Sequence, residues 1–150
     1  MKYQISCIGK SENKTEKLLI DKYLKRIGPK LKIKELNLKK FNTFTEIEKQ
    51  GEELIKIFPQ DSVLFLLDKD GFSFSTEKLA EIIKQYEMSN IKLINFVIGG
   101  PYGHGENIKL KAKHIISFGK MTWSHLLARI MIVEQLYRIE TIFKNHPYHK

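Results

Sequence analysis

Residues 92–101 read KLINFVIGGP, an almost continuous apolar run that ends in two glycines and a proline. Such a run is typical of a buried strand in a parallel sheet, and the Gly-Gly-Pro sequence marks the loop that follows it. Other short stretches along the chain also have strand character. They predict strands at Tyr3–Ile8 (YQISCI), Leu31–Leu38 (LKIKELNL), Ser62–Leu67 (SVLFLL) and Ile115–Phe118.

Helical patterns lie between these predicted strands. Apolar spacing and capping residues predict helices from Ser11 to about Ile27, from Phe44 to Phe58, from Ser75 or Thr76 to about Met88, and from Ser124 to about Lys144. A short helix is expected after the Gly-Gly-Pro loop, and Asp68–Phe74 is interpreted as a turn around Gly71. Strands that alternate with helices imply an α/β fold with a mostly parallel sheet and helices on both faces, in a single domain of residues 1–150.

The composition indicates a soluble globular protein. Of the 150 residues, 42% are hydrophobic and 29% are charged, as in a soluble globular domain. The apolar runs are far shorter than the ~20 residues that cross a membrane, and the N-terminal MKYQISCIG has no signal-peptide core. We therefore expect a cytoplasmic protein with no membrane partner. One cysteine, Cys7, excludes an internal disulfide and a thiolate zinc cluster, and no metal is expected.

Positive charge is concentrated at the two ends of the sequence. The net charge is +7 over residues 1–50, −3 over residues 51–100 and +5 over residues 101–150. This distribution favours a polyanionic partner, although lysine could also be merely the preferred surface residue. Arg129 and Arg138 fall in one helical segment, where arginine offers planar, bidentate contacts to phosphate that lysine cannot provide.

Three loops follow predicted strands and are the candidates for a ligand site: Leu67–Phe74, Gly99–Gly105 and Gly119–Ser124. Ligands of parallel α/β sheets bind beyond the carboxyl ends of the strands. The second loop, GGPYGHG, is neither a Walker loop nor a dinucleotide fingerprint. It indicates a small-molecule site, because glycines let a ligand approach the backbone, and a purely structural turn remains the alternative.

The last predicted helix and the tail carry further candidates. His125 stands at the start of this helix, where the dipole disfavours imidazolium and leaves a ring able to accept a proton; local capping is the alternative. Glu134 and Arg138 are spaced to pair at i,i+4. The helix is apolar over much of its circumference, so it should be buried or shared with a partner subunit. The tail HPYHK suits base stacking and phosphate contact, unless it is a disordered end.

Several of these stretches resemble one known family. FVIGGPYG at 96–103, SFGKMTWSHLLARIMIVEQLYR at 117–138 and NHPYHK at 145–150 are similar to the ribosomal RNA large subunit methyltransferase H family, a small bacterial branch of the SPOUT methyltransferases. YQISCIGK and LLDKDG resemble it too, and the match covers the whole chain. The resemblance implies a C-terminal deep trefoil knot, S-adenosylmethionine as cofactor and a homodimer. The implied reaction is methylation of N3 of a pseudouridine in the helix-69 stem-loop of 23S rRNA, on assembled ribosomes.

The resemblance also implies roles for individual residues. Cofactor contacts are expected from Leu67, Gly100, Gly119, Lys120, Met121, Thr122, Trp123 and Ser124. The imide nitrogen must lose a proton, so a base or a favourable cation is needed, and the candidates are His125, Arg138, Tyr148 and His149. Arg129 and Lys150 are expected to contact RNA. The family commonly has proline where this chain has Ser124, and often another residue where it has His104. A SPOUT methyltransferase acting on tRNA, or a flavodoxin-like RNA- or nucleotide-binding module without catalysis, are the alternatives.

Overall fold

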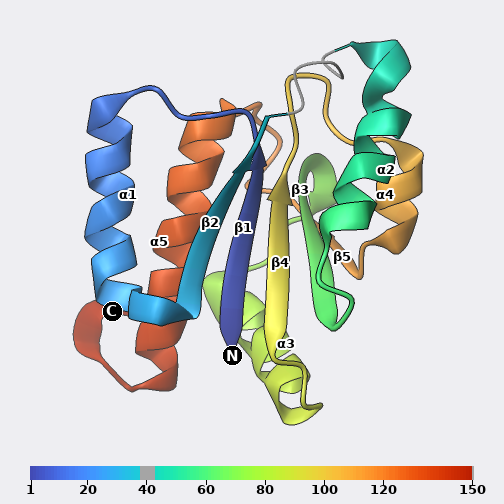
Figure 1. The fold of residues 1–150 in the computed structure, drawn as a ribbon. Coiled ribbons are helices and arrows are strands. Elements are labelled where there is room, and N and C mark those ends of the chain that lie inside the picture. Colours follow the sequence, from blue (N-terminus) through green and yellow to red (C-terminus); the bar gives the residue numbers. More distant parts are fainter. Residues whose placement is uncertain (38–42, 150) are drawn as a thin grey trace.

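The computed structural model describes residues 1–37 and 43–149, the last of these by its backbone alone. These residues form a five-stranded parallel sheet in the order β2-β1-β4-β3-β5 (Figure 1). The strands are β1 (Lys2–Ile8), β2 (Leu31–Leu36), β3 (Ser62–Phe72), β4 (Leu93–Ile98) and β5 (His114–Ile116). The helices are α1 (Lys14–Ile27), α2 (Ile47–Ile57), α3 (Thr76–Met88), α4 (Glu106–Lys111) and α5 (His125–Phe143), with short 3-10 turns at η1 (Gly28–Lys30), η3 (Phe44–Glu46) and η4 (Pro147–His149).

Helices cover both faces of the sheet, as predicted. The helices α1, α3 and α5 pack on one face, and α2 and α4 pack on the other (Figure 1). Alternate residues of β3 enter the two cores: Phe65 packs under α3 and α5, whereas Leu64 and Leu66 pack under α2 and α4. Because β3 and β4 are buried from both sides, their sequences are almost entirely apolar. In the part of the chain that the structure describes, no helix is both long and apolar enough to cross a bilayer.

The N-terminal cap of α1 differs from the prediction. Asn13, not Ser11, caps the helix: its side chain accepts hydrogen bonds from the amides of Thr15 and Glu16. Ser11 is buried instead, and its amide donates to a carboxylate oxygen of Glu35 at the end of β2. The hydrogen bond between Ser11 and Glu35, which are distant in sequence, keeps Ser11 out of the capping position. The helix therefore begins later than the local sequence pattern predicts. Ser75, one of the two predicted caps, caps α3. The last helix was predicted to begin at Ser124, and in the structure Ser124 caps α5 and the helix begins at His125.

Strand β3 runs through the segment that was interpreted as a turn. Leu67 and Phe72 both pair with Ile116 of β5, so residues 68–71 form an excursion within one strand. Ser117 is tied to this excursion, because its amide donates to the carbonyl of Phe72 and its hydroxyl to that of Lys69. These bonds end β5 at Ile116, earlier than predicted. Strand β2 ends at Leu36, and its predicted end at Leu38 lies outside the described residues.

The excursion requires glycine at position 71. A Cβ atom there would lie 2.7 Å from the backbone carbonyl carbon and oxygen of Ile115. We expect Gly71→Ala to lower the free energy of unfolding by about 2 kcal/mol, because backbone atoms must shift to relieve the overlap. Urea denaturation measures the loss. Gly100→Ala is the control, because its Cβ would meet Gln50 and Ile8 at an ordinary 3.6 Å. Equal stabilities of the two variants would contradict this account.

Candidate functional site

The three loops singled out in the sequence meet around one cavity of about 680 Å³. The cavity lies at the carboxyl ends of β3, β4 and β5. Its wall is formed by residues 67–70, residues 98–104 and most of residues 116–125. The parallel arrangement explains this convergence, because it brings the carboxyl ends of neighbouring strands to the same edge of the sheet.

Much of the cavity wall is backbone. The amide of Gly103 donates to the carbonyl of Gly100 at 3.0 Å, which closes a tight turn after β4. A Cβ at Gly99 would lie 3.0 Å from the carbonyl oxygen of Gly103, so a side chain at position 99 would crowd the turn. Gly119, on the opposite loop, has a φ of 104°, which L residues rarely adopt. Glycine therefore shapes both loops.

Two polar side chains are fixed at the end of β3. Asp68 accepts a hydrogen bond from the amide of Asp70, and its other carboxylate oxygen lies 3.6 Å from Nζ of Lys109. The buried His104 ring has Nε2 3.1 Å from the carbonyl oxygen of Leu67. Burial lowers the pKa of His104, so the ring is neutral at pH 7, and Nε2 must carry its proton in order to donate to that carbonyl. His104 thereby holds the carbonyl of Leu67, the last residue of β3 before the excursion, in place.

Comparisons with known proteins agree with this architecture. A family model described as a predicted SPOUT methyltransferase matches residues 1–149. A protein of Flavobacterium psychrophilum named ribosomal RNA large subunit methyltransferase H is 40% identical over 156 residues, which cover 99% of each chain. Proteins of the same name from Flavobacterium johnsoniae and Bartonella tribocorum are 38% and 35% identical, each over at least 99% of both chains.

The chain belongs to the SPOUT methyltransferase family. The resemblance to ribosomal RNA large subunit methyltransferase H is confirmed at the same time. SPOUT methyltransferases generally use S-adenosylmethionine, and the cavity has suitable properties for it. Its volume lies within the range of about 300–1,000 Å³ of small-molecule sites. Its glycine loops expose backbone groups to a ligand.

Most of the residues predicted to bind the cofactor lie together in this SPOUT methyltransferase. Those that line the cavity are Leu67, Gly100, Gly119, Met121, Thr122, Trp123 and Ser124. Lys120 is exposed and is not among the lining residues. Ser124, where the family commonly has proline, caps α5, because its hydroxyl accepts the amide of Leu127 at 3.3 Å. His125 follows as the first residue of α5 and also lines the cavity.

Arg129 is not placed to contact RNA, contrary to expectation. It is 1% exposed, and its guanidinium donates to Glu35 at 2.6 Å and to the carbonyl of Gly9 at 3.4 Å. Although burial on its own would raise the pKa of Glu35, hydrogen bonds from the Ser11 amide and from Arg129 hold that pKa below its usual value. The pair joins the first turns of α5 to the carboxyl ends of β1 and β2. Its role in this structure is to fix the helix that carries His125.

Arg138 and Tyr148 meet in a second network at the other end of α5. Glu134 accepts two hydrogen bonds from Arg138, the shorter at 2.6 Å, as the i,i+4 spacing predicted. The hydroxyl of Tyr148 donates to the same carboxylate oxygen at 3.2 Å. A hydrogen bond with Tyr23, burial and the Glu134 charge all raise the pKa of Tyr148. In this arrangement its hydroxyl donates to the Glu134 carboxylate.

The two groups of candidate residues are far apart within one chain. His125 and Arg138 are separated by 13 residues of α5, or about 20 Å at 1.5 Å per residue. The turn η4 packs against α5 at the end of the helix that lies away from the carboxyl edge of the sheet (Figure 1). For His149 only the backbone is described, and Lys150 lies outside the described residues.

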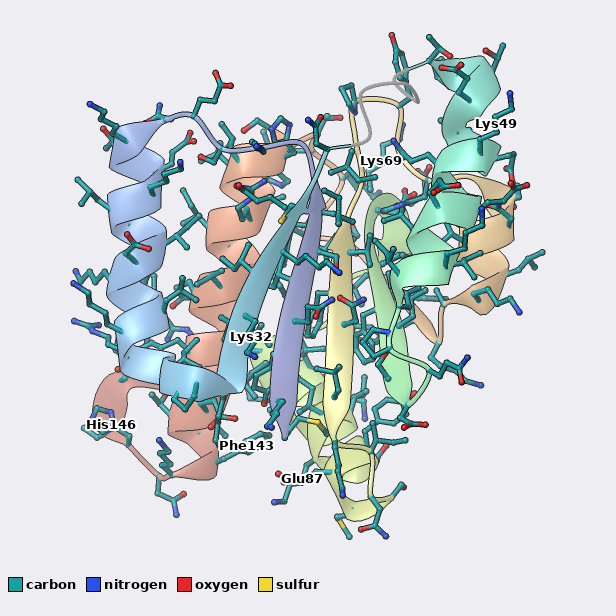
Figure 2. The ribbon with its side chains drawn as sticks, in the orientation of Figure 1. Lys32, Lys49, Lys69, Glu87, Phe143 and His146 are labelled. Carbon is teal, nitrogen blue, oxygen red and sulfur yellow. The ribbon has the colours of Figure 1, made fainter. Side chains whose placement is uncertain are left out.

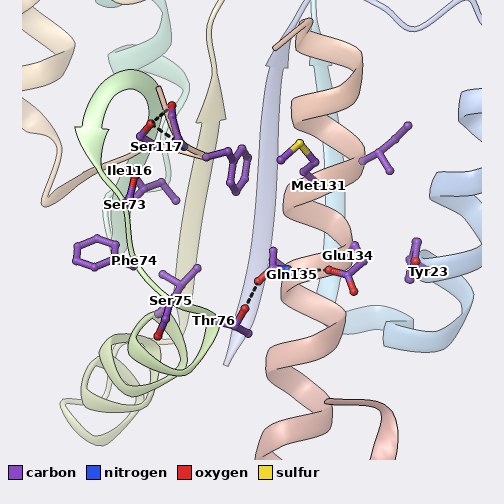
Figure 3. A pocket seen from close by; sticks show the side chains of 14 residues that line it. Tyr23, Ser73, Phe74, Ser75, Thr76, Ile116, Ser117, Met131, Glu134 and Gln135 are labelled. Atoms are coloured by element: carbon purple, nitrogen blue, oxygen red, sulfur yellow. Dashed lines mark hydrogen bonds between the residues drawn. The ribbon is translucent and has the colours of Figure 1, made fainter. Parts of the chain in front are cut away.

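A second cavity of about 620 Å³ lies along α5 between these groups (Figure 3). Gly119 lines both cavities, so the strip 116–119 is a wall between them. Thr76 donates to Gln135 at 2.7 Å across the second cavity and thereby links α3 to α5. Glu134 lines this cavity as well, so the tail network borders it.

Sequence reasoning gave no role to several residues that line the first cavity. They include Phe44, Asp68, Lys69, Tyr102, His104 and Lys109. Asp68 directly follows Leu67, which was predicted to contact the cofactor, and His104 stands within the glycine-rich loop. Their positions in these two loops could therefore have predicted that both residues line the cavity. The pairing of Asp68 with Lys109 had no local signal. Among the described residues, no group of three or more His, Cys, Asp or Glu side chains could hold a metal ion.

The Arg129–Glu35 pair should contribute measurably to stability. We expect Glu35→Gln to lower the free energy of unfolding by about 2 kcal/mol at pH 7, because it leaves a buried guanidinium without its counter-charge. A lowered folded pKa gives stability that is present above the usual value of 4.5 and is lost below it. The difference from wild type should therefore shrink as the pH falls below that value. Urea denaturation at several pH values measures it.

Glu81→Gln is the matched control for this prediction. Glu81 pairs with Lys78 on the surface, where both side chains are more than half exposed. Surface pairs contribute little, so the control should change stability by less than about 0.5 kcal/mol. A Glu35→Gln variant that is as stable as this control at neutral pH would show that the buried pair does not anchor α5.

Proposed function

We propose that this chain transfers the methyl group of S-adenosylmethionine to N3 of a pseudouridine in the helix-69 stem-loop of 23S rRNA, on assembled ribosomes. The observation that carries the proposal is the cavity in which the cofactor loops and His125 come together, in a chain whose whole length matches the SPOUT family. The names of its relatives support large-subunit rRNA as the substrate. The pI of about 9.5 supports a polyanionic partner. A ribosomal substrate implies a cytoplasmic location.

The chain has groups suited to each requirement of this reaction. When bound, S-adenosylmethionine supplies an activated methyl group, so the protein mainly has to align the two reactants. The turn at Gly99–Gly103 and the loop at Gly119–Ser124 would hold the cofactor through their backbone. The imide nitrogen must lose its proton, and His125 lines the cavity where a neutral imidazole would accept it. Arg138 would favour the imide anion by its positive charge.

We infer that two copies of the chain form the active enzyme. The axial separation of about 20 Å keeps Arg138 and Tyr148 away from the cavity of their own chain. A two-fold partner is the simplest arrangement that brings the tail of one copy to the cavity of the other. The exposed apolar side chains of Leu18 and Leu19 on α1 and of Leu127 on α5 would be covered in such a dimer. Family membership also supports a deep trefoil knot in the C-terminal segment.

Labelled cofactor tests the substrate directly. Ribosomes that lack the modification, naked 23S rRNA and tRNA are offered as methyl acceptors, and mass spectrometry locates the product. We expect methylation of ribosomes, with much slower transfer to naked 23S rRNA, and a rate that falls steeply as salt rises. Preferential transfer to tRNA would identify a different substrate. Absence of transfer to every acceptor would favour a binding module.

Alanine substitutions in the two glycine loops should change the cofactor affinity by different amounts. Gly119→Ala forces alanine into a φ of 104°, so we expect the loop to move and the affinity for S-adenosylmethionine to fall about tenfold. Gly100→Ala should retain the affinity within about threefold, because the added Cβ would point toward Gln50 and Ile8. Isothermal calorimetry on both variants, with circular dichroism to check folding, gives the comparison. Equal affinities would remove Gly119 from the cofactor site.

Mixed dimers test whether the site is shared. One parent carries Gly119→Ala, and the other lacks Tyr148–Lys150; with the cofactor held well below the wild-type Kd, we expect the first to keep about a tenth of the wild-type activity and the second to be nearly inactive. Co-expression with two affinity tags isolates the mixed dimer, in which one of two sites has both an intact cofactor loop and an intact tail. We expect it to regain roughly half of the wild-type activity. A mixed dimer no more active than its parents would place tail and cofactor in the same subunit.

A further inference from the structure

Two aromatic side chains stand open to solvent at the mouth of the cofactor cavity. Phe44 is 70% exposed and Tyr102 is 42% exposed, and both line the cavity. Their ring centroids are 4.9 Å apart, with the ring planes inclined by 53°. This tilt lets the rings touch while most of the Phe44 surface stays uncovered. Large apolar rings that remain exposed beside a ligand cavity indicate a surface that another molecule covers.

Short, hydrogen-bonded turns hold both rings. Tyr102 stands at the tip of the turn that Gly100 and Gly103 close. Phe44 begins the 3-10 turn η3, where the Glu46 amide donates to the carbonyl of Thr43 at 3.1 Å and the Thr43 hydroxyl donates to the Glu46 carboxylate at 2.9 Å. A ring on a fixed turn loses little conformational freedom when a partner covers it.

A clamp between α2 and α4 fixes the two turns relative to each other. The carboxylate of Glu48 accepts the amides of Glu106 and Asn107, and the Asn107 side chain donates back to the Glu48 carbonyl at 2.6 Å. The approach is close: a Cβ on Gly51 would overlap the Asn107 side-chain oxygen at 2.1 Å. Because η3 precedes α2 and the Tyr102 turn precedes α4, this clamp sets the position of Phe44 relative to Tyr102.

Two exposed lysines lie at the same end of the molecule as the rings. Lys69 lines the same cavity, and Lys49 lies in the first turn of α2, next to the clamp. Figure 2 shows both at the end of the molecule that holds the carboxyl edge of the sheet. The nearby carboxylates of Asp68 and Glu48 are engaged by Lys109 and by the α4 amides. Rings beside lysines suit a ligand that carries both a flat base and a phosphate.

We propose that Phe44 and Tyr102 form a stacking surface for an unpaired rRNA base next to the methylated nucleotide, with Lys49 and Lys69 on its phosphates. The proposal rests on the proposed function for its substrate. The adenine of the cofactor is the competing occupant, but S-adenosylmethionine has no phosphate for the two lysines. Each RNA nucleotide joins a base to a phosphate, and bases in RNA loops are open to stacking on aromatic side chains.

Phe44→Leu and Tyr102→Leu test the surface, since leucine keeps an apolar side chain and removes the π face. Phe72→Leu is the control: Phe72 is 75% exposed and lies against Phe74, but it is not among the residues that line this cavity. For each of the first two variants we expect the KM for ribosomes to rise about tenfold, the size of one lost base stack. The kcat, the cofactor Kd from calorimetry and all values of the control should stay within about twofold of wild type.

Other outcomes would overturn the proposal. A cofactor Kd that rises together with the KM would assign the rings to adenine, and an unchanged KM would show that no base stacks there. Ultraviolet crosslinking of the wild-type protein to ribosomes gives a separate readout, with nucleotide adducts expected on the peptides that contain Phe44 or Tyr102. Adducts confined to other peptides would refute the stacking surface. If the wild-type protein forms the expected adducts but does not methylate ribosomes, the proposed function fails while the RNA surface stands.

Discussion

Ile116 pairs with both Leu67 and Phe72, and the arrangement of the site depends on this double pairing. It turns residues 68–71 into an excursion at the end of β3 and holds the segment after β5 against it through Ser117. Asp68 is thereby placed in the same cavity as Gly119, although they are far apart in the sequence. The strip 116–119 also becomes the wall between the two cavities, so a change in this pairing would alter both.

Helix α5 then sets the spacing of the functional groups. The buried pair of Arg129 with Glu35 fixes one end of the helix to the sheet, which places His125 in the wall of the first cavity. At the other end of the helix, the Glu134 carboxylate accepts hydrogen bonds from Arg138 and Tyr148. A straight helix cannot bring its two ends together, so the distance between these groups is a consequence of its length alone. This constraint is the physical reason for proposing a shared site.

Local chemistry was sufficient to predict much of this arrangement. The apolar runs of β3 and β4, the cap at Ser75, the start of α5 near Ser124 and the Glu134–Arg138 pair depend on neighbours in the sequence, and all were predicted. The errors concern contacts between distant residues. Ser11 does not cap α1, and Arg129 is buried, because Glu35 of another element binds both. The contact between Phe44 and Tyr102 joins two loops through the clamp of α2 with α4, which has no local signal either.

The ion pair of Arg138 with Glu134 limits how the C-terminal tail could bind an anion. Its guanidinium already holds a carboxylate, and the Glu134 hydrogen bonds raise the pKa of Arg138 further, so it remains a cation throughout. It can therefore bind a phosphate or an imide anion only by exchanging Glu134 for that anion or by sharing its remaining donors. One of these, Nη1, donates to the Tyr148 carbonyl at a long 3.4 Å. Because Arg138 also lies over the Tyr148 ring, 5.0 Å from its centroid, an anion that draws Arg138 away would remove both of these contacts from Tyr148. The tail would then respond to RNA as one unit, with its two contacts released together.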